Sequence, residues 1–205
     1  MACNLTRGRL VDCKDVIGGI KTVYFVDTYA DNIRAFATFG TGDTASTMSS
    51  GGFTNWSSYG TTTGSTQTLF KYDLRPDLSS VTVNLTSDPA TGTTFFEQTL
   101  ALTLQKQTAA DSNQMRLIAY NRPQIFVFDT NDNLYLLGMD NGCDMTSGTV
   151  VSGAAKGDMA GYTFGFVAKE KEPQIWLTAT ASPTVDKTPF DGLGDEAGIT
   201  IVEGS

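Results

Sequence analysis

The fold class is decided by residues 78–105, LSSVTVNLTSDPATGTTFFEQTLALTLQ, along which apolar and polar side chains alternate in two runs. In the first run, residues 78–87, valine and leucine fall on one side and threonine and asparagine on the other. After a turn signal of aspartate, proline and glycine, the alternation resumes over residues 96–105, with Gln98 as its exception. A period of two is typical of half-exposed strands, so this segment predicts two strands that pair antiparallel.

Strand patterns recur on both sides of this segment. Residues 23–26, VYFV, form a β-branched and aromatic run that predicts a strand buried on both faces. Residues 124–138 place two apolar runs on either side of Asn-Asp-Asn, which predicts a second β-hairpin. Further strands are expected over residues 162–168 and 175–179.

One helix interrupts the strands. The sequence TAADSNQMRLIAYN brings Thr108 and Asp111 into the spacing of a helix cap and places Met115, Ile118 and Ala119 on one helical face. The proline at position 123 forbids continuation much beyond position 120. We expect a short helix that covers one open face of a sheet.

Length and composition fit one β-rich domain. The chain has 205 residues, of which 40% are hydrophobic and only 18% charged. We predict a mainly β fold, an antiparallel β-sandwich or rolled barrel, with one short flanking α-helix. Residues 1–182 form this domain and include a long Gly/Ser/Thr loop at about 38–68. Residues 183–205 have no core-facing period and form a C-terminal extension that is either mobile or ordered only on assembly.

The long loop carries the candidate interface residues. Phe53, Trp56 and Tyr59 occur at three-residue intervals among glycine, serine and threonine. Aromatic side chains concentrate binding energy when they are fully desolvated, so these three are candidate anchors between neighbouring copies. The alternative is that they fold back and cap their own sandwich.

The sequence offers little catalytic chemistry. The chain has no histidine, no P-loop and no GxGxxG motif, and no pair of acidic residues is set apart by its surroundings. Asp129, Asn131, Asn133 and Asp140 echo a calcium-binding loop, but Leu134 stands where that loop needs glycine, so a hairpin turn is the better interpretation. We predict no catalytic, cofactor or metal site and do not expect an enzyme.

Charge, cysteine content and hydropathy exclude further classes. A formal charge of -8 disfavours a protein that grips nucleic acid. The three cysteines, Cys3, Cys13 and Cys143, form no metal-binding pattern; reduced thiols are the simpler expectation, with a Cys3–Cys13 pair as the alternative. The charged N-terminal segment predicts no signal peptide, and no stretch is apolar enough to insert into a membrane.

Several longer motifs resemble a known family. They are VDCKDVIGGIKTVYFVD near the start, then FFEQTLALTLQKQTAAD, RLIAYNRPQIFVFDTNDNLYLLGMDNGCD and SGAAKGDMAGYTFGFVAKEKEP. Together they resemble virion structural proteins of tailed bacteriophages, most of all the tail tube, or major tail, proteins. The resemblance does not extend to the long loop or to the C-terminal tail.

This resemblance implies a rolled β-sandwich that forms stacked hexameric rings, whose inner strands join into a barrel around a DNA-conducting lumen. An acidic lumen would repel phosphate, which suits the charge of the chain. The implied partners are further copies of the chain, other tail or head proteins and passing genomic DNA, and no membrane. The implied location is the virion tail, assembled in the host cytoplasm.

Two other functions stay open. A head decoration or head-tail connector protein would share the β-rich architecture and the lack of catalysis. A glycan- or host-surface-binding β-sandwich is a candidate from another class. In that case Trp56, Tyr59 and Tyr162 would form an exposed platform on which sugar rings stack.

Overall fold

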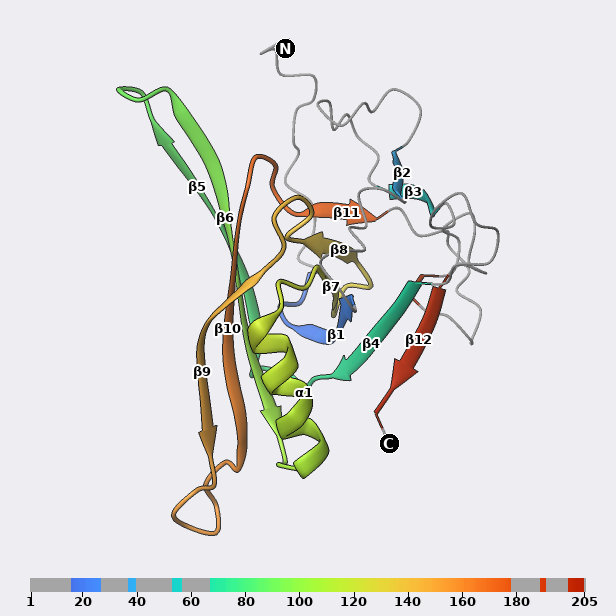
Figure 1. Ribbon diagram of the computed structural model, residues 1–205, viewed down its shortest axis with the longest axis vertical. Coiled ribbons are helices and arrows are strands. Elements are labelled where there is room, and N and C mark those ends of the chain that lie inside the picture. The colour runs from blue at the N-terminus through green and yellow to red at the C-terminus, as the bar shows by residue number, and fades with distance from the viewer. Residues whose placement is uncertain are drawn as a thin grey trace.

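A computed structural model describes residues 16–26, 37–39, 53–56, 67–177, 189–190 and 199–204. These residues form twelve strands and one helix (Figure 1). In chain order the elements are β1 (Ile20–Val26), β2 (Ala37–Phe39), β3 (Phe53–Trp56), β4 (Gln67–Asp73), β5 (Ser80–Asp88), β6 (Thr93–Gln105), α1 (Ala109–Tyr120), β7 (Ile125–Asp129), β8 (Leu134–Leu137), β9 (Asp144–Val151), β10 (Gly161–Glu170), β11 (Ile175–Leu177) and β12 (Ile199–Glu203).

The strands form two sheets. One has eight strands in the order β12-β4-β1-β7-β8-β11-β3-β2, and the other has four in the order β5-β6-β10-β9. The predicted mainly β class with one helix is therefore confirmed for the described residues. The expectation of purely antiparallel pairing is wrong at two places, because β12 pairs parallel with β4 and β11 pairs parallel with β3. Both parallel pairs join strands far apart in the chain, and local sequence patterns carry no signal of such pairing.

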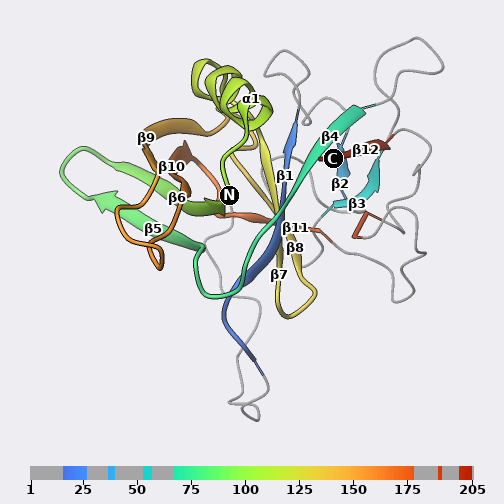
Figure 2. The same cartoon turned by 90° about the horizontal axis from the view of Figure 1, so that it is seen from below.

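The two sheets pack face to face (Figures 1 and 2). Val23 and Phe25 of β1 belong to the core between the sheets, together with Leu100 of β6 and Phe166 of β10. Tyr24, which alternates with them along β1, belongs to a second core on the opposite face of the eight-stranded sheet. The predicted burial of this strand on both faces is confirmed.

Both predicted hairpins are confirmed. β5 and β6 pair antiparallel, with Val81 opposite Leu100, and β7 pairs antiparallel with β8. In the turn of the second hairpin, Asp129 Oδ1 accepts hydrogen bonds from the backbone N–H groups of Asn131 and Asn133, at 2.8 Å each. The carboxylate therefore holds the turn together, in agreement with its interpretation as a hairpin.

The helix begins and ends as predicted. Thr108 Oγ1 accepts a hydrogen bond from the backbone N–H of Asp111 at 3.0 Å, which caps the first turn. Met115 is buried in the core between the sheets and Ile118 packs against it, but Ala119 is exposed. The Tyr162 hydroxyl on β10 lies 2.6 Å from Ser112 Oγ and ties the helix to the four-stranded sheet.

The C-terminal part contributes to the fold, although its sequence shows no core-facing period. Phe190 is completely buried in the second core, where its ring lies edge-on to Tyr24 and Phe126. β12 adds to the edge of the eight-stranded sheet beside β4. Ile201 of β12 packs against the second core, but its partner β4 is far away in the chain, so the local sequence did not reveal this pairing.

Candidate assembly surface

Two of the three predicted interface residues lie near one end of the eight-stranded sheet. Phe53 and Trp56 are in β3, which pairs with β11 on one side and β2 on the other. The expected loop at 38–68 therefore contains a strand, formed because β11 offers it a pairing edge. Tyr59 lies outside the described residues. The role of the three aromatic residues as anchors stays a prediction.

One residue of the expected glycan-binding platform, Tyr162, is buried. Tyr162 is only 2% exposed, within the core between the two sheets. Its hydroxyl donates to the backbone carbonyl of Thr108 at 3.3 Å, and its ring stacks on Phe164 with centroids 5.8 Å apart. A buried ring cannot stack on a sugar, so the expectation that Tyr162 is exposed is wrong. Tyr162 and the next residue, Thr163, lie on opposite faces of β10. The sequence pattern of a strand does not show which of the two faces is buried.

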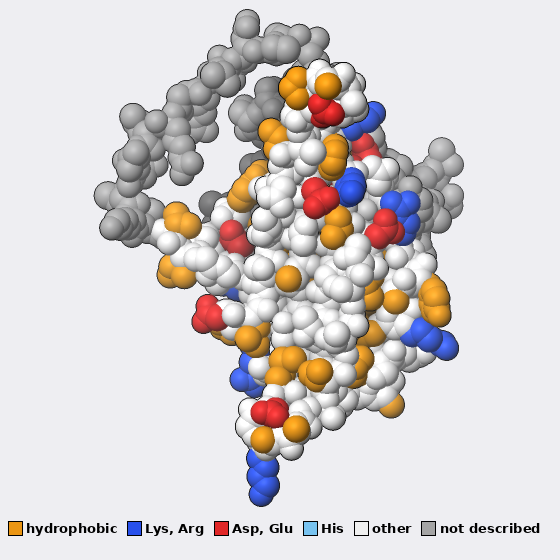
Figure 3. Space-filling model, turned by 90° about the vertical axis from the view of Figure 1, so that its left-hand side faces the viewer, with side chains coloured by type: hydrophobic (Ala, Val, Ile, Leu, Met, Phe, Trp, Pro, Cys, Tyr) orange, Lys and Arg blue, Asp and Glu red, His pale blue; other side chains and the backbone are white. Residues whose placement is uncertain are grey.

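The four-stranded sheet has one face packed on the eight-stranded sheet and one face directed away from it. The residues of this outer face are set by the strand register and alternate with the buried ones. The outer face comprises Ser80, Thr82, Asn84, Thr86 and Asp88 of β5, Thr93, Phe95, Glu97, Thr99, Ala101, Thr103 and Gln105 of β6, Gly161, Thr163, Gly165, Val167 and Lys169 of β10, and Asp144, Ser147, Thr149 and Val151 of β9. Serine and threonine are its commonest residues. Figure 3 shows few charged side chains over the middle of this side of the molecule.

Most charges on the outer face are paired. Lys169 Nζ lies 3.5 Å from Glu97 Oε2 on the neighbouring strand. Asp144 Oδ1 lies 2.9 Å from Nε of Arg122, which precedes β7. Surface ion pairs of this kind contribute little to stability, but they neutralise the charges in this part of the face. The remaining carboxylate of the face, Asp88, lies at the hairpin end of β5 and accepts from the backbone N–H of Ala90.

Both edges of the four-stranded sheet are free within the described part of the chain. β5 pairs only with β6, and β9 pairs only with β10. Neither strand contains lysine or proline, the residues by which proteins commonly blunt an exposed edge. β9 carries a register shift opposite Gly165 and Phe166, whereas β5 is regular over its nine residues. β5 is therefore the less protected edge.

The hairpins of this sheet extend beyond the body of the molecule in opposite directions (Figure 1). The strand register places Leu85 of β5 and Val150 of β9 on the inner face of the sheet, opposite to the outer face. Leu85 is nevertheless 60% exposed and Val150 63% exposed. The tip between β9 and β10 is ordered by Asp158, whose carboxylate accepts from the backbone N–H groups of Ala154 and Ala155 at 2.9 and 2.7 Å. The bonds to Ala155 and Ala154 lower the pKa of Asp158. Both hairpins therefore present apolar side chains that their own chain leaves uncovered in the described structure.

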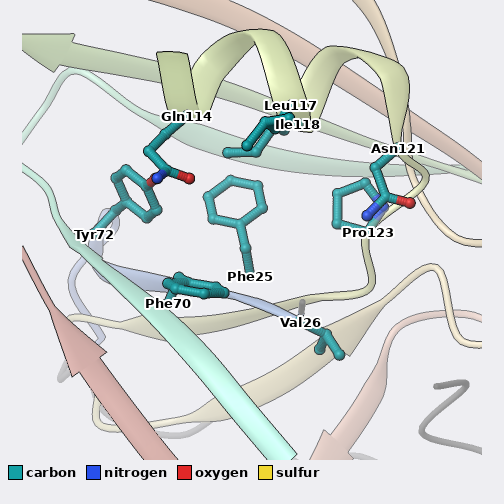
Figure 4. Close-up of a pocket in the computed structure, with 9 residues that line it drawn as sticks. All are labelled: Phe25, Val26, Phe70, Tyr72, Gln114, Leu117, Ile118, Asn121 and Pro123. Atoms are coloured by element: carbon teal, nitrogen blue, oxygen red, sulfur yellow. The ribbon is translucent and has the colours of Figure 1, made fainter. Parts of the chain in front are cut away.

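A small cavity of about 90 Å³ lies between α1 and the eight-stranded sheet. Figure 4 shows the Phe25 ring pointing from β1 toward Leu117 and Ile118 of the helix. Phe70 and Pro123 complete its apolar wall. A space of this size and composition accommodates one apolar side chain, and it holds no nucleophile or acid-base pair.

A more open groove of about 520 Å³ separates the start of α1 from β4 and β12. Its main ionic group is Lys71, whose Nζ lies 2.6 Å from Glu203 and 3.7 Å from Asp73. The hydrogen bond to Glu203 is the main reason why the pKa of Lys71 is raised. Lys106 and Asp111 also line the groove, so it mixes acidic and basic side chains without a cluster of one charge that would select a ligand. Among the described residues, no cluster of acidic or cysteine side chains could hold a metal ion.

Comparison of the chain with models of protein families, with curated proteins and with solved structures finds no match. No helix in the described ranges is both long and apolar enough to cross a membrane. The functional inference therefore rests on the surfaces of the molecule itself. Sequence reasoning identified the alternation of β5 and β6, but the partners of these strands, and hence the free edges, come from the tertiary structure.

Proposed function

We propose that this chain is a non-enzymatic virion structural protein, a phage tail tube subunit that assembles into stacked rings around a DNA-conducting channel. The observation that carries the proposal is the pair of unprotected edges of the four-stranded sheet. An exposed, regular strand without lysine or proline pairs readily with another chain. A protein that keeps such an edge on β5, and a second free edge on β9, is suited to work as an assembly.

The strand directions permit a ring. β5 is antiparallel to β6, β6 to β10 and β10 to β9, so β5 and β9 run in opposite directions. β9 of one copy can therefore pair antiparallel with β5 of the next copy after a simple rotation. This contact joins two different surfaces, and repeated heterologous contacts generate a ring when the rotation closes. The sheets of all copies would then form one continuous barrel without edges.

The proposal is tested by charging the edge. Replacing Thr82 and Thr86 on β5 with lysine adds two exposed like charges to the strand without touching a buried side chain. A matched control carries two lysines at Ala119 and Tyr120, which are exposed on α1 and not part of either edge strand. Light scattering over a concentration series and negative-stain electron microscopy report assembly, and circular dichroism reports folding.

We expect the wild-type protein and the helix control to form rings or tubes with a central hole, and the edge variant to stay monomeric with an unchanged spectrum. An edge variant that assembles like the wild type would show that β5 is not the joining edge. A wild-type protein that is monomeric at every concentration would refute self-assembly and favour a decoration or glycan-binding role.

A further inference from the structure

We propose that the outer face of the four-stranded sheet is the wall past which duplex DNA moves, and that this wall is neutral and hydroxyl-bearing, not acidic. The inference rests on the proposed function, since only a ring of these sheets encloses a channel. In such a ring the bulk of each subunit, including the eight-stranded sheet and α1, packs on the other face of the four-stranded sheet. The outer face is the one left to line the channel.

The side chains in the middle of the outer face are suited to a channel wall that neither binds nor repels a polyanion. One row across the sheet consists of Thr103, Thr163 and Thr149 on three adjacent strands. The next row consists of Ala101, Gly165 and Ser147, with Ser80 beyond Ala101. Small and hydroxyl-bearing side chains in register keep this part of the wall smooth and hydrated.

Electrostatics distinguish this wall from a DNA-binding surface. Proteins grip duplex DNA by neutralising phosphates with lysine and arginine, which releases condensed counterions. Lys169 is the lysine of the outer face, and its ammonium group faces the Glu97 carboxylate. A wall with no unpaired cation releases few counterions, so it offers DNA little net attraction. Hydroxyl groups can exchange hydrogen bonds with phosphates and water as the duplex passes, without reading its sequence.

The same charge balance argues against an acidic wall. The register places three carboxylates on this face: Glu97 and Asp144 each have a cation within 4 Å, and Asp88 lies apart from them at the hairpin end of β5. The chain's overall charge of -8 therefore does not describe the surface assigned to the channel. Neutrality, and not repulsion, is the property that we expect to keep DNA from sticking.

The test places cations on the wall. A variant with lysine at Thr99 and Thr163 charges two adjacent strands in the middle of the outer face, and the control again carries lysines at Ala119 and Tyr120 on α1. Assembled particles are mixed with a short fluorescent duplex, sedimented at low and moderate salt, and treated with nuclease. A second variant with lysine at Ala101 and Thr103 serves if the first does not assemble.

We expect wild-type particles to retain no duplex at either salt concentration. Wall-charged particles should retain duplex that nuclease cannot reach. Raising the salt from about 50 to about 200 mM should weaken this retention at least about tenfold, even if only two phosphates are neutralised. Duplex held by the helix control should be digested.

Two results would overturn the inference while leaving the proposed function in place. In the first, wild-type particles retain duplex and lose it with salt, so the wall is a gripping surface. In the second, duplex bound to wall-charged particles is digested as readily as that on the control, so the outer face lies outside the channel. If the wild-type protein forms no particles, the proposed function and this inference fall together.

Discussion

Replacing Gln98 with leucine should destabilise the monomer, although leucine restores the alternating pattern of β6. Gln98 is 3% exposed and faces the core between the sheets. Its Oε1 accepts a hydrogen bond from the backbone N–H of Gly138 at 3.0 Å, and its Nε2 donates to the carbonyl of Glu172 at 3.2 Å. The side chain thus joins the four-stranded sheet to the segments that follow β8 and β10.

The magnitude follows from the groups that leucine would leave unpaired. Gly138 is buried, and a buried N–H without an acceptor costs about 1–3 kcal/mol. The Glu172 carbonyl belongs to a half-buried residue and can regain water, so it adds less. We expect the free energy of unfolding to fall by about 2 kcal/mol, which lowers the melting temperature by about 4–8 °C in a domain of this size.

Urea denaturation at a protein concentration where light scattering reports monomers measures this loss. Gln105→Leu, at the exposed end of the same strand, is the matched control and should change the free energy of unfolding by less than about 0.5 kcal/mol. If Gln98→Leu is as stable as the wild type, the two hydrogen bonds do not contribute as argued.

Two further predictions concern the helix and the alkaline limit of stability. Thr108→Ala removes the cap of α1 and should cost about 1 kcal/mol in thermal unfolding, whereas Thr108→Ser should retain most of the stability. Burial, with a smaller effect of Asp129, raises the pKa of Tyr135 to about 12. Because the folded state disfavours the phenolate, stability should decline as the pH rises from about 10 towards about 12. Tyr135→Phe should make this decline shallower in melting curves, and an unchanged slope would argue against the assignment.

The sequence by itself determined the strands, turns and caps that depend only on residues close together in the chain. The alternation in β5 and β6, the Asn-Asp-Asn turn between β7 and β8, and the Thr108 cap each follow from short-range chemistry that the sequence states directly. They suffice for a β-rich fold with one helix. The absence of histidine and of phosphate-binding motifs likewise constrained function without any structure.

Contacts between distant segments were decided by the tertiary structure alone. β12 joins β4, and Phe190 packs in the core against Tyr24, because the eight-stranded sheet presents an edge and an apolar face that no local pattern encodes. Tyr162 is buried and its neighbour Thr163 is only half-buried for the same reason, since a period of two defines two faces without saying which one is covered. The free edges and neutral outer face of the four-stranded sheet, on which the functional proposals rest, exist only once strands far apart in the chain have paired.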